Sequence, residues 1–156
     1  MERLLPPRLW LLCVLSSVAA GLLLPVGGTS PLAVRLAGVP VFLVGAWLSA
    51  GGSRRFERLG ANIVTTKDPT ALVSDGTFAW SRNPMYLGFL LACAGVAFAV
   101  GTIVAWAGPL LFFAITDRWY IPFEERRMMD VFGERYLQYQ RNVRRWIGRR
   151  RPVVSS

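Results

Sequence analysis

Histidine is absent from this chain of 156 residues, and cysteine occurs only twice. Without histidine the chain lacks the commonest metal ligand, the usual general base and a histidine ligand for haem. Cys13 and Cys93 both fall within predicted apolar helices, so the sequence predicts neither a disulfide framework nor a cysteine metal site. We therefore expect no metal centre.

Acidic residues are also scarce: nine aspartates and glutamates stand against 18 lysines and arginines, which gives a formal net charge of +9. A strongly basic protein can bind nucleic acid, but here the basic residues flank apolar segments and do not line a soluble surface. An excess of basic residues on one side of a membrane explains the charge better. We predict membrane lipids, and no nucleic acid, as partners.

Long apolar segments are abundant, since hydrophobic residues make up 53% of the chain and the mean hydropathy is +0.40. About 17–20 helical residues, each rising about 1.5 Å, cross a hydrocarbon core of roughly 30 Å. The sequence predicts an all-α, polytopic membrane protein that forms a single domain over residues 1–156. The predicted transmembrane helices are residues 9–26, 32–50, 84–101 and 102–120, and a cytosolic amphipathic helical segment follows at 123–148.

Basic residues in the connections indicate how these helices are oriented. The connections between the first and second helices and between the third and fourth carry almost no charge, whereas residues 53–82 and the C-terminal segment are rich in arginine. Arg35 lies near the start of the second helix, where its long side chain can reach the interface. By the positive-inside rule both termini are cytoplasmic, and we expect a multi-pass protein of a bacterial inner membrane.

Two short polar motifs stand on either side of the last helical hairpin: Ser81–Tyr86 before it and Pro122–Glu125 after it. A hairpin of two transmembrane helices returns to the side of the membrane that it left. The spacing therefore predicts that both motifs lie at one membrane face, where they could jointly hold a polar ligand.

Each motif also has a simpler explanation. Asn83 and Pro84 are favoured at helix starts, Tyr86 could be an interfacial aromatic, and Glu124 and Glu125 suit the first turn of a helix. These explanations do not account for the convergence, because carboxylates near a membrane are costly unless they are paired or hydrated. Adjacent helical positions point about 100° apart, so one acid could meet an ammonium or ribose while the other bonds Arg82 or a backbone cap.

Several segments over about residues 60–148 together resemble the isoprenylcysteine carboxyl methyltransferase family, which is related to the membrane phospholipid N-methyltransferases. The order and intervals of the segments make the combination specific, and the chain is most similar to bacterial-type members. The segments are Leu72–Phe78, Ser81–Gly88, Glu124–Arg126, Phe132–Tyr139 and Val143–Trp146.

The resemblance implies an integral membrane enzyme that binds S-adenosylmethionine at the cytosolic ends of its last helices. The positions implied for the cofactor site are Gly76, Asn83, Pro84, Tyr86, Leu87, Glu124 and Glu125, with Tyr136 and Tyr139 closing it from the C-terminal helix. Eukaryotic members have histidine where this chain has Asn83. Because asparagine carries no charge, that position is excluded from acid–base catalysis here.

Methyl transfer from a sulfonium suits a site with so few reactive residues, because the leaving group is a neutral thioether and positioning can supply much of the acceleration. A carboxylate acceptor needs only a cation to orient it, and the candidates are Arg127, Arg144 and Arg145. An amine acceptor would instead need a base, for which Glu125 or Asp117 is nearest. We expect a lipophilic acceptor, either the carboxylate of a prenylcysteine-like compound or another lipid.

Two other classes of protein fit parts of the sequence. A non-enzymatic four-helix membrane subunit would use every motif as a helix cap, but the Glu-Glu-Arg and Phe-Gly-x-x-Tyr signals are richer than packing requires. A membrane reductase would bind a nicotinamide cofactor, whose pyrophosphate the paired glutamates would repel. The sequence favours the methyltransferase.

Overall fold

The computed structural model describes residues 6–24, 26–58 and 71–150, and within these ranges it contains helices and no strand, which confirms the all-α prediction. Three basic residues used for the topology prediction, Arg3, Lys67 and Arg151, lie outside the described residues. The helices are α1 (Pro6–Leu23), α2 (Leu32–Leu36), α3 (Gly38–Arg58), α4 (Pro84–Val100), α5 (Ala107–Ile115), α6 (Ile121–Phe132) and α7 (Glu134–Asn142), with 3-10 turns η1 (Gly76–Ala79) and η2 (Ile103–Trp106) and a π-helical turn η3 (Thr116–Tyr120).

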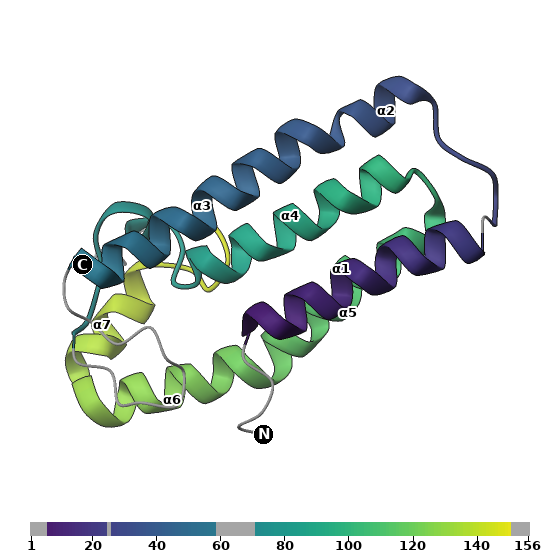
Figure 1. The fold of residues 1–156 in the computed structure, drawn as a ribbon. Helices are drawn as coiled ribbons and strands as arrows, with labels where there is room; N and C mark the ends of the chain where they lie inside the picture. Colours follow the sequence, from purple (N-terminus) through teal and green to yellow (C-terminus); the bar gives the residue numbers. More distant parts are fainter. Residues whose placement is uncertain (1–5, 25, 59–70, 151–156) are drawn as a thin grey trace.

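Helix α4 is the centre of the fold. It packs against α3 on one side and against α1 and α5 on the other (Figure 1). The packed side chains of α1, α4 and α5 form one apolar cluster whose fully or nearly fully buried members include Cys13, Cys93 and Phe112. Cys13 and Cys93 are both free thiols.

Glycines bring α3 and α4 into backbone contact. A Cβ atom added to Gly45 would lie 2.4 Å from the backbone nitrogen of Ala92, and one added to Gly88 would lie 2.5 Å from the backbone nitrogen of Ser49. In a membrane the hydrophobic effect does not drive helices together, because lipid tails are as apolar as the side chains. Helix pairs there associate through close packing, which small residues allow. The glycine contacts therefore fix α3 along the length of α4.

Among the residues that the structure describes, two stretches are long and apolar enough to cross a membrane: Pro6–Leu23 and Leu32–Arg55, with 18 and 24 residues. The apolar helix α4 is shorter, with 17 residues. Many large apolar side chains on α1 and α3 face outward, among them Leu15 and Trp47, which are 55% and 67% exposed. Exposed apolar surface of this extent is consistent with a membrane protein.

The fourth predicted helix, 102–120, does not end before a separate cytosolic helix. Helices α5 and α6 are joined by the π-helical turn η3, so the chain is helical without a break from Ala107 to Phe132 (Figure 1). Pro122 has no N–H to give to the preceding turn, and the wider η3 turn accommodates its ring. The expected break at Pro122 is therefore wrong.

The C-terminal segment 123–148 is not one helix either. Gly133, with a φ of +50°, separates α6 from α7, and α7 ends at Asn142. Residues 143–149 instead form a small hairpin, in which Val143 bridges Arg149 and the Arg144 N–H donates to the Gly148 carbonyl at 2.9 Å. The three- to four-residue periodicity of apolar residues continues past Asn142, but the backbone pairs within the hairpin.

Candidate functional site

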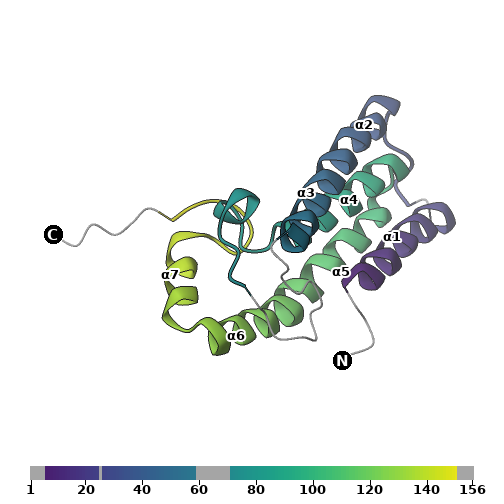
Figure 2. The same ribbon diagram turned by 60° about the vertical axis from the view of Figure 1, so that its left-hand side comes forward.

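The two polar motifs meet at one end of the helical bundle, as the sequence predicts. Helix α4 begins there at Pro84, and the long α5–α6 helix passes beside it and extends beyond the bundle (Figures 1 and 2). The Tyr86 hydroxyl donates a hydrogen bond of 2.8 Å to Oε1 of Glu124, across 38 residues of sequence. Tyr86 is 6% exposed and Glu124 is half-buried, so this contact is partly shielded from solvent.

Glu125 points to a different set of partners. Its Oε1 accepts hydrogen bonds from Arg82 at 2.6 and 3.2 Å, and its Oε2 accepts one from Arg145 at 2.8 Å. The side chains of Arg82 and Glu125 are only 7% and 12% exposed. One of the two acids thus bonds Arg82, which is one of the roles that the sequence left open for the pair.

Arg145 links this pair to the π-helical turn η3 within the long helix. Its Nη1 donates 3.2 Å to Oδ1 of Asp117, which also accepts 2.9 Å from the indole N–H of Trp146. The hydrogen bond to Glu125 raises the pKa of the Arg145 guanidinium above its ordinary value. Asp117 is therefore fixed by Arg145 and Trp146 of the C-terminal hairpin.

Asn83 does not cap α4 with its side chain. Its Nδ2 donates 3.2 Å to the backbone carbonyl of Arg145, while its backbone N–H donates 3.0 Å to the hydroxyl of Ser81. Pro84 occupies the first turn of α4, where its missing N–H costs nothing. The simpler explanation of Asn83 as a side-chain cap therefore does not hold, because its amide binds the hairpin although the residue stands at the N-cap position.

Helix α7 has two buried tyrosines, Tyr136 and Tyr139, and Tyr139 supports the turn that carries Gly76. The Tyr139 hydroxyl donates 2.7 Å to the carbonyl of Phe78 in η1. Burial raises the pKa of Tyr136 to about 12, with a further contribution from the charge of Glu125. These two rings therefore lie beneath the site, and their contacts are structural in character.

Gly76 begins η1 with a φ of +58°, a conformation that favours glycine, and an added Cβ atom would meet nothing within 4 Å. Asp75, directly before it, pairs through both carboxylate oxygens with Arg55 at the end of α3. The hydrogen bonds from Arg55 lower the pKa of the Asp75 carboxyl. The turn is thus open on its glycine side and tied to α3 on the other.

The remaining predicted residues lie around this group. Leu87 follows Tyr86 on α4 and is half-buried, and Arg127 lies on α6 with its guanidinium 5.5 Å from the centre of the Phe123 ring. Arg144 is exposed on the hairpin, where its backbone carbonyl accepts 3.1 Å from the Arg82 N–H. Of the three predicted arginines, Arg145 lies within the cluster of paired charges.

The sequence analysis missed the part played by the C-terminal hairpin. Carbonyl groups of Val143 and Arg145 accept hydrogen bonds from Arg82 and Asn83, and the Gly148 N–H donates 2.6 Å to Trp80. In the sequence this part of the chain stands out only as the Val143–Trp146 segment of the family resemblance. Its contacts are made by backbone carbonyl groups, which every residue type has, so the side-chain pattern does not predict them.

Comparison with known proteins identifies residues 34–135 as a phospholipid methyltransferase domain. Over 79 residues the chain is 39% identical to methanethiol S-methyltransferase 1 of Bradyrhizobium diazoefficiens, an alignment that covers 49% of this chain and 26% of that protein. It is 33% identical over 75 residues to the protein-S-isoprenylcysteine O-methyltransferase of Schizosaccharomyces pombe, with 46% of this chain and 30% of that protein covered. An uncharacterized protein of Haemophilus influenzae is 33% identical over 63 residues, its whole length, which cover 40% of this chain.

No solved structure matches the chain. The chain covers less than a third of the length of the two named methyltransferases, and the matched domain covers well over half of this chain. The resemblance to the isoprenylcysteine methyltransferases is confirmed. This chain belongs to the phospholipid methyltransferase family.

Proposed function

We propose that this protein is a membrane-embedded methyltransferase that uses S-adenosylmethionine to methylate a lipophilic acceptor at the cytosolic membrane face. The observation that carries the proposal is the Tyr86–Glu124 hydrogen bond, because it joins the two motifs on either side of the helical hairpin. Membership of a methyltransferase family favours this function over a nicotinamide-dependent reductase.

The chemistry of the cluster suits S-adenosylmethionine. That molecule carries an ammonium, a carboxylate, a ribose diol and a sulfonium, and the cluster offers carboxylates beside guanidinium groups within a largely buried setting. Glu124 and Tyr86 would meet the positive groups or the ribose, and the open side of Gly76 would allow a close approach of its backbone. Asn83, Pro84, Leu87, Tyr136 and Tyr139 would complete and support the site.

Glu125 has a supporting role in this proposal. Two arginines already bind both of its oxygens, so it would hold α6, the segment just before α4 and the hairpin together. We assign ligand binding to Glu124 and positioning to Glu125.

Bound S-adenosylmethionine supplies an electrophilic methyl group on a sulfur that leaves as a neutral thioether, so the protein needs to position the acceptor and exclude water. For a carboxylate acceptor we propose Arg127, Arg144 and Arg145 as candidates for the orienting cation, and Arg145 would do so while it also binds Glu125 and Asp117. Relatives named for methylating methanethiol and protein isoprenylcysteine leave both a thiol and a carboxylate as acceptor groups.

We further propose four transmembrane helices with both termini in the cytoplasm of a bacterium. Besides the two long apolar stretches, α4 has 17 residues, about 26 Å at about 1.5 Å each, and the chain is helical from Ile103 to Tyr120. Slight thinning of the bilayer accommodates such lengths. The site would then lie at the cytosolic end of the last two spans.

Isothermal titration of the detergent-purified protein with S-adenosylmethionine tests the cofactor. We expect binding by the wild type, at least a tenfold higher Kd for Glu124→Ala, and no change for Glu134→Ala, an exposed glutamate at the start of α7. A wild type that binds nothing, or a Glu124→Ala variant that binds normally, contradicts the proposal.

Transfer of a tritiated methyl group to prenylcysteine or to extracted lipids tests the acceptor. A methyl ester is cleaved by base and releases volatile methanol, whereas a methyl group on sulfur or nitrogen is retained. Release of the label by base therefore identifies a carboxylate acceptor, and its retention identifies the other classes.

A further inference from the structure

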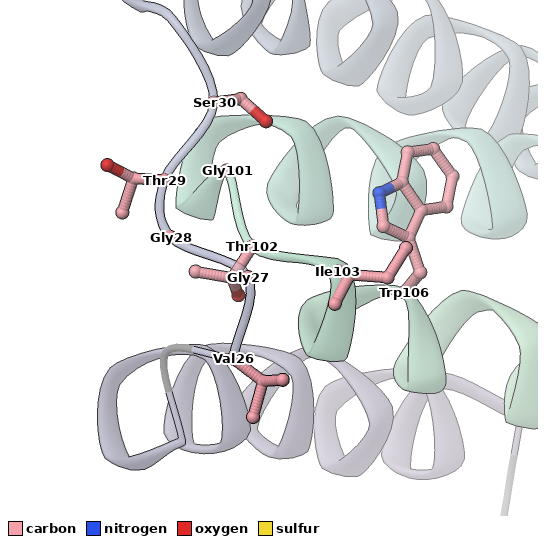
Figure 3. A pocket seen from close by; sticks show the side chains of 9 residues that line it. All are labelled: Val26, Gly27, Gly28, Thr29, Ser30, Gly101, Thr102, Ile103 and Trp106. Atoms are coloured by element: carbon pink, nitrogen blue, oxygen red, sulfur yellow. The ribbon is translucent and has the colours of Figure 1, made fainter.

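A hollow of about 230 Å³ lies at the end of the bundle away from α6 and α7, where α1 connects to α2 (Figure 1), and nine residues line it (Figure 3). The connection from α1 to α2 and the connection from α4 to η2 form it together, and the Ser30 N–H donates 2.7 Å to the Gly101 carbonyl between them. Backbone and hydroxyl groups of Gly28, Thr29 and Ser30 line one side, whereas Ile103 and Trp106 line the other. The hollow is therefore polar on one wall and apolar on the other.

The side chain of Arg35 contacts Gly101, which lines this hollow. Arg35 is exposed, its Nε donates 2.9 Å to the carbonyl of Ala99 near the end of α4, and its stem lies against Gly101, where an added Cβ atom would be 2.9 Å from its Cδ. Capping the end of α4 in this way uses only Nε. The terminal nitrogens of the guanidinium remain as a two-pronged donor for an anion.

No acid in the described part of the chain forms an ion pair with Arg35. Between residues 9 and 53, and between residues 83 and 116, Arg35 is the sole charged residue in the sequence. An uncompensated arginine beside backbone and hydroxyl donors attracts a phosphate more strongly than a neutral ligand.

Apolar side chains surround the hollow. Val26 and Ile103 on its rim are 62% and 69% exposed, and Leu32 at the start of α2 is 67% exposed. These apolar side chains make no favourable contact with a soluble phosphate, whereas the acyl chains of a lipid can pack against them. We propose that Arg35 and this hollow bind the phosphate-bearing headgroup of a membrane lipid, at the face opposite the methyltransferase site. The inference rests on the membrane placement proposed above and not on methyl transfer.

Binding of a short-chain lipid to the purified protein tests this proposal. Isothermal titration in detergent would compare dioctanoyl phosphatidylglycerol, dioctanoylglycerol and inorganic phosphate. We expect the wild type to bind the phosphatidylglycerol and to bind the uncharged dioctanoylglycerol at least tenfold more weakly. Equal binding of the two lipids would overturn the proposal, because the headgroup would then contribute nothing.

Two variants locate the site. Arg35→Gln removes the cation, and Ile103→Trp fills the hollow while it keeps Arg35; each should raise the Kd for phosphatidylglycerol at least tenfold. Arg141→Gln, an exposed arginine of α7, is the matched control and should bind as the wild type does. If Arg35→Gln does not fold, Ile103→Trp still decides the question. Unchanged binding by Ile103→Trp contradicts the assignment.

The source of the phosphate is decided by competition. Inorganic phosphate should not displace the lipid at tenfold excess, and displacement at equal concentration would contradict a lipid headgroup and indicate a free phosphate ligand. Titration with S-adenosylmethionine on the same samples keeps the two proposals separate, since the lipid variants should bind the cofactor as the wild type does.

Discussion

The proposed site is best tested by the different roles assigned to its two glutamates, ligand binding for Glu124 and positioning for Glu125. Replacing Glu125 with glutamine removes the one carboxylate that Arg82 and Arg145 share. Loss of one partner from a buried ion pair costs roughly 3–5 kcal/mol, because the other charge stays buried without compensation. Arg145 is 33% exposed and would still be paired with Asp117, so Arg82 is the charge that would lose its compensation. We therefore expect a destabilisation at the lower end of this range, about 3 kcal/mol.

A loss of about 3 kcal/mol corresponds to a fall in Tm of roughly 6–12 °C for a protein of this size. Glu124→Gln keeps an acceptor for the Tyr86 hydroxyl, so we expect it to cost only about 1 kcal/mol, or roughly 2–4 °C. The binding of S-adenosylmethionine should change in the opposite order. Glu124→Gln should weaken it strongly, and Glu125→Gln should weaken it mainly through loss of the folded state.

Thermal unfolding in detergent, followed by circular dichroism, and titration with S-adenosylmethionine at a temperature where both variants are folded measure the two effects. The reasoning is refuted if Glu125→Gln lowers the Tm no more than Glu124→Gln does. It is equally refuted if folded Glu125→Gln loses cofactor binding while Glu124→Gln retains it.

Three further predictions concern the scaffold. Gly45→Ala places a methyl group 2.4 Å from a backbone nitrogen of α4 and should cost about 1–3 kcal/mol in thermal unfolding, whereas Gly51→Ala, where a Cβ meets nothing, should be neutral or stabilising. Tyr139→Phe removes the bond to the η1 carbonyl and should cost about 1 kcal/mol and raise the Kd for S-adenosylmethionine; an unchanged Kd would separate η1 from the site. Burial raises the pKa of Tyr136 from 10.0 to about 12, so the folded state favours the neutral phenol. The contribution of Tyr136 to the free energy of unfolding is therefore complete below pH 10 and is lost as the pH rises to about 12. That loss amounts to about 2–3 kcal/mol, and Tyr136→Phe should reduce the alkaline decline in Tm.

The sequence predicts the meeting of the two motifs because it depends on topology alone. A hairpin of apolar helices must return Glu124 to the level of Tyr86, whatever the details of packing. The proline at the start of α4 was equally predictable, because its missing N–H suits only the first turn. The role of these residues in cofactor binding stays a prediction.

Other features depend on contacts that side-chain patterns do not encode. Two adjacent glutamates look alike in sequence, and only the positions of Arg82 and Arg145 show that both arginines bind Glu125. Asn83 resembles a helix cap, yet its amide binds a carbonyl 62 residues away. The hairpin after Asn142 follows from backbone hydrogen bonds, so helical periodicity past that point is misleading.

The unbroken helix from Ala107 to Phe132 has a mechanical consequence for a protein in a bilayer. Glu124 follows Ile115, the last residue of α5, by nine residues without an intervening loop, which sets it about 13 Å further along one stiff rod. If α5 spans the membrane as proposed, a shift of α5 along the membrane normal would move both acids with it. The thickness of the surrounding membrane thereby sets the depth at which an acceptor would meet them.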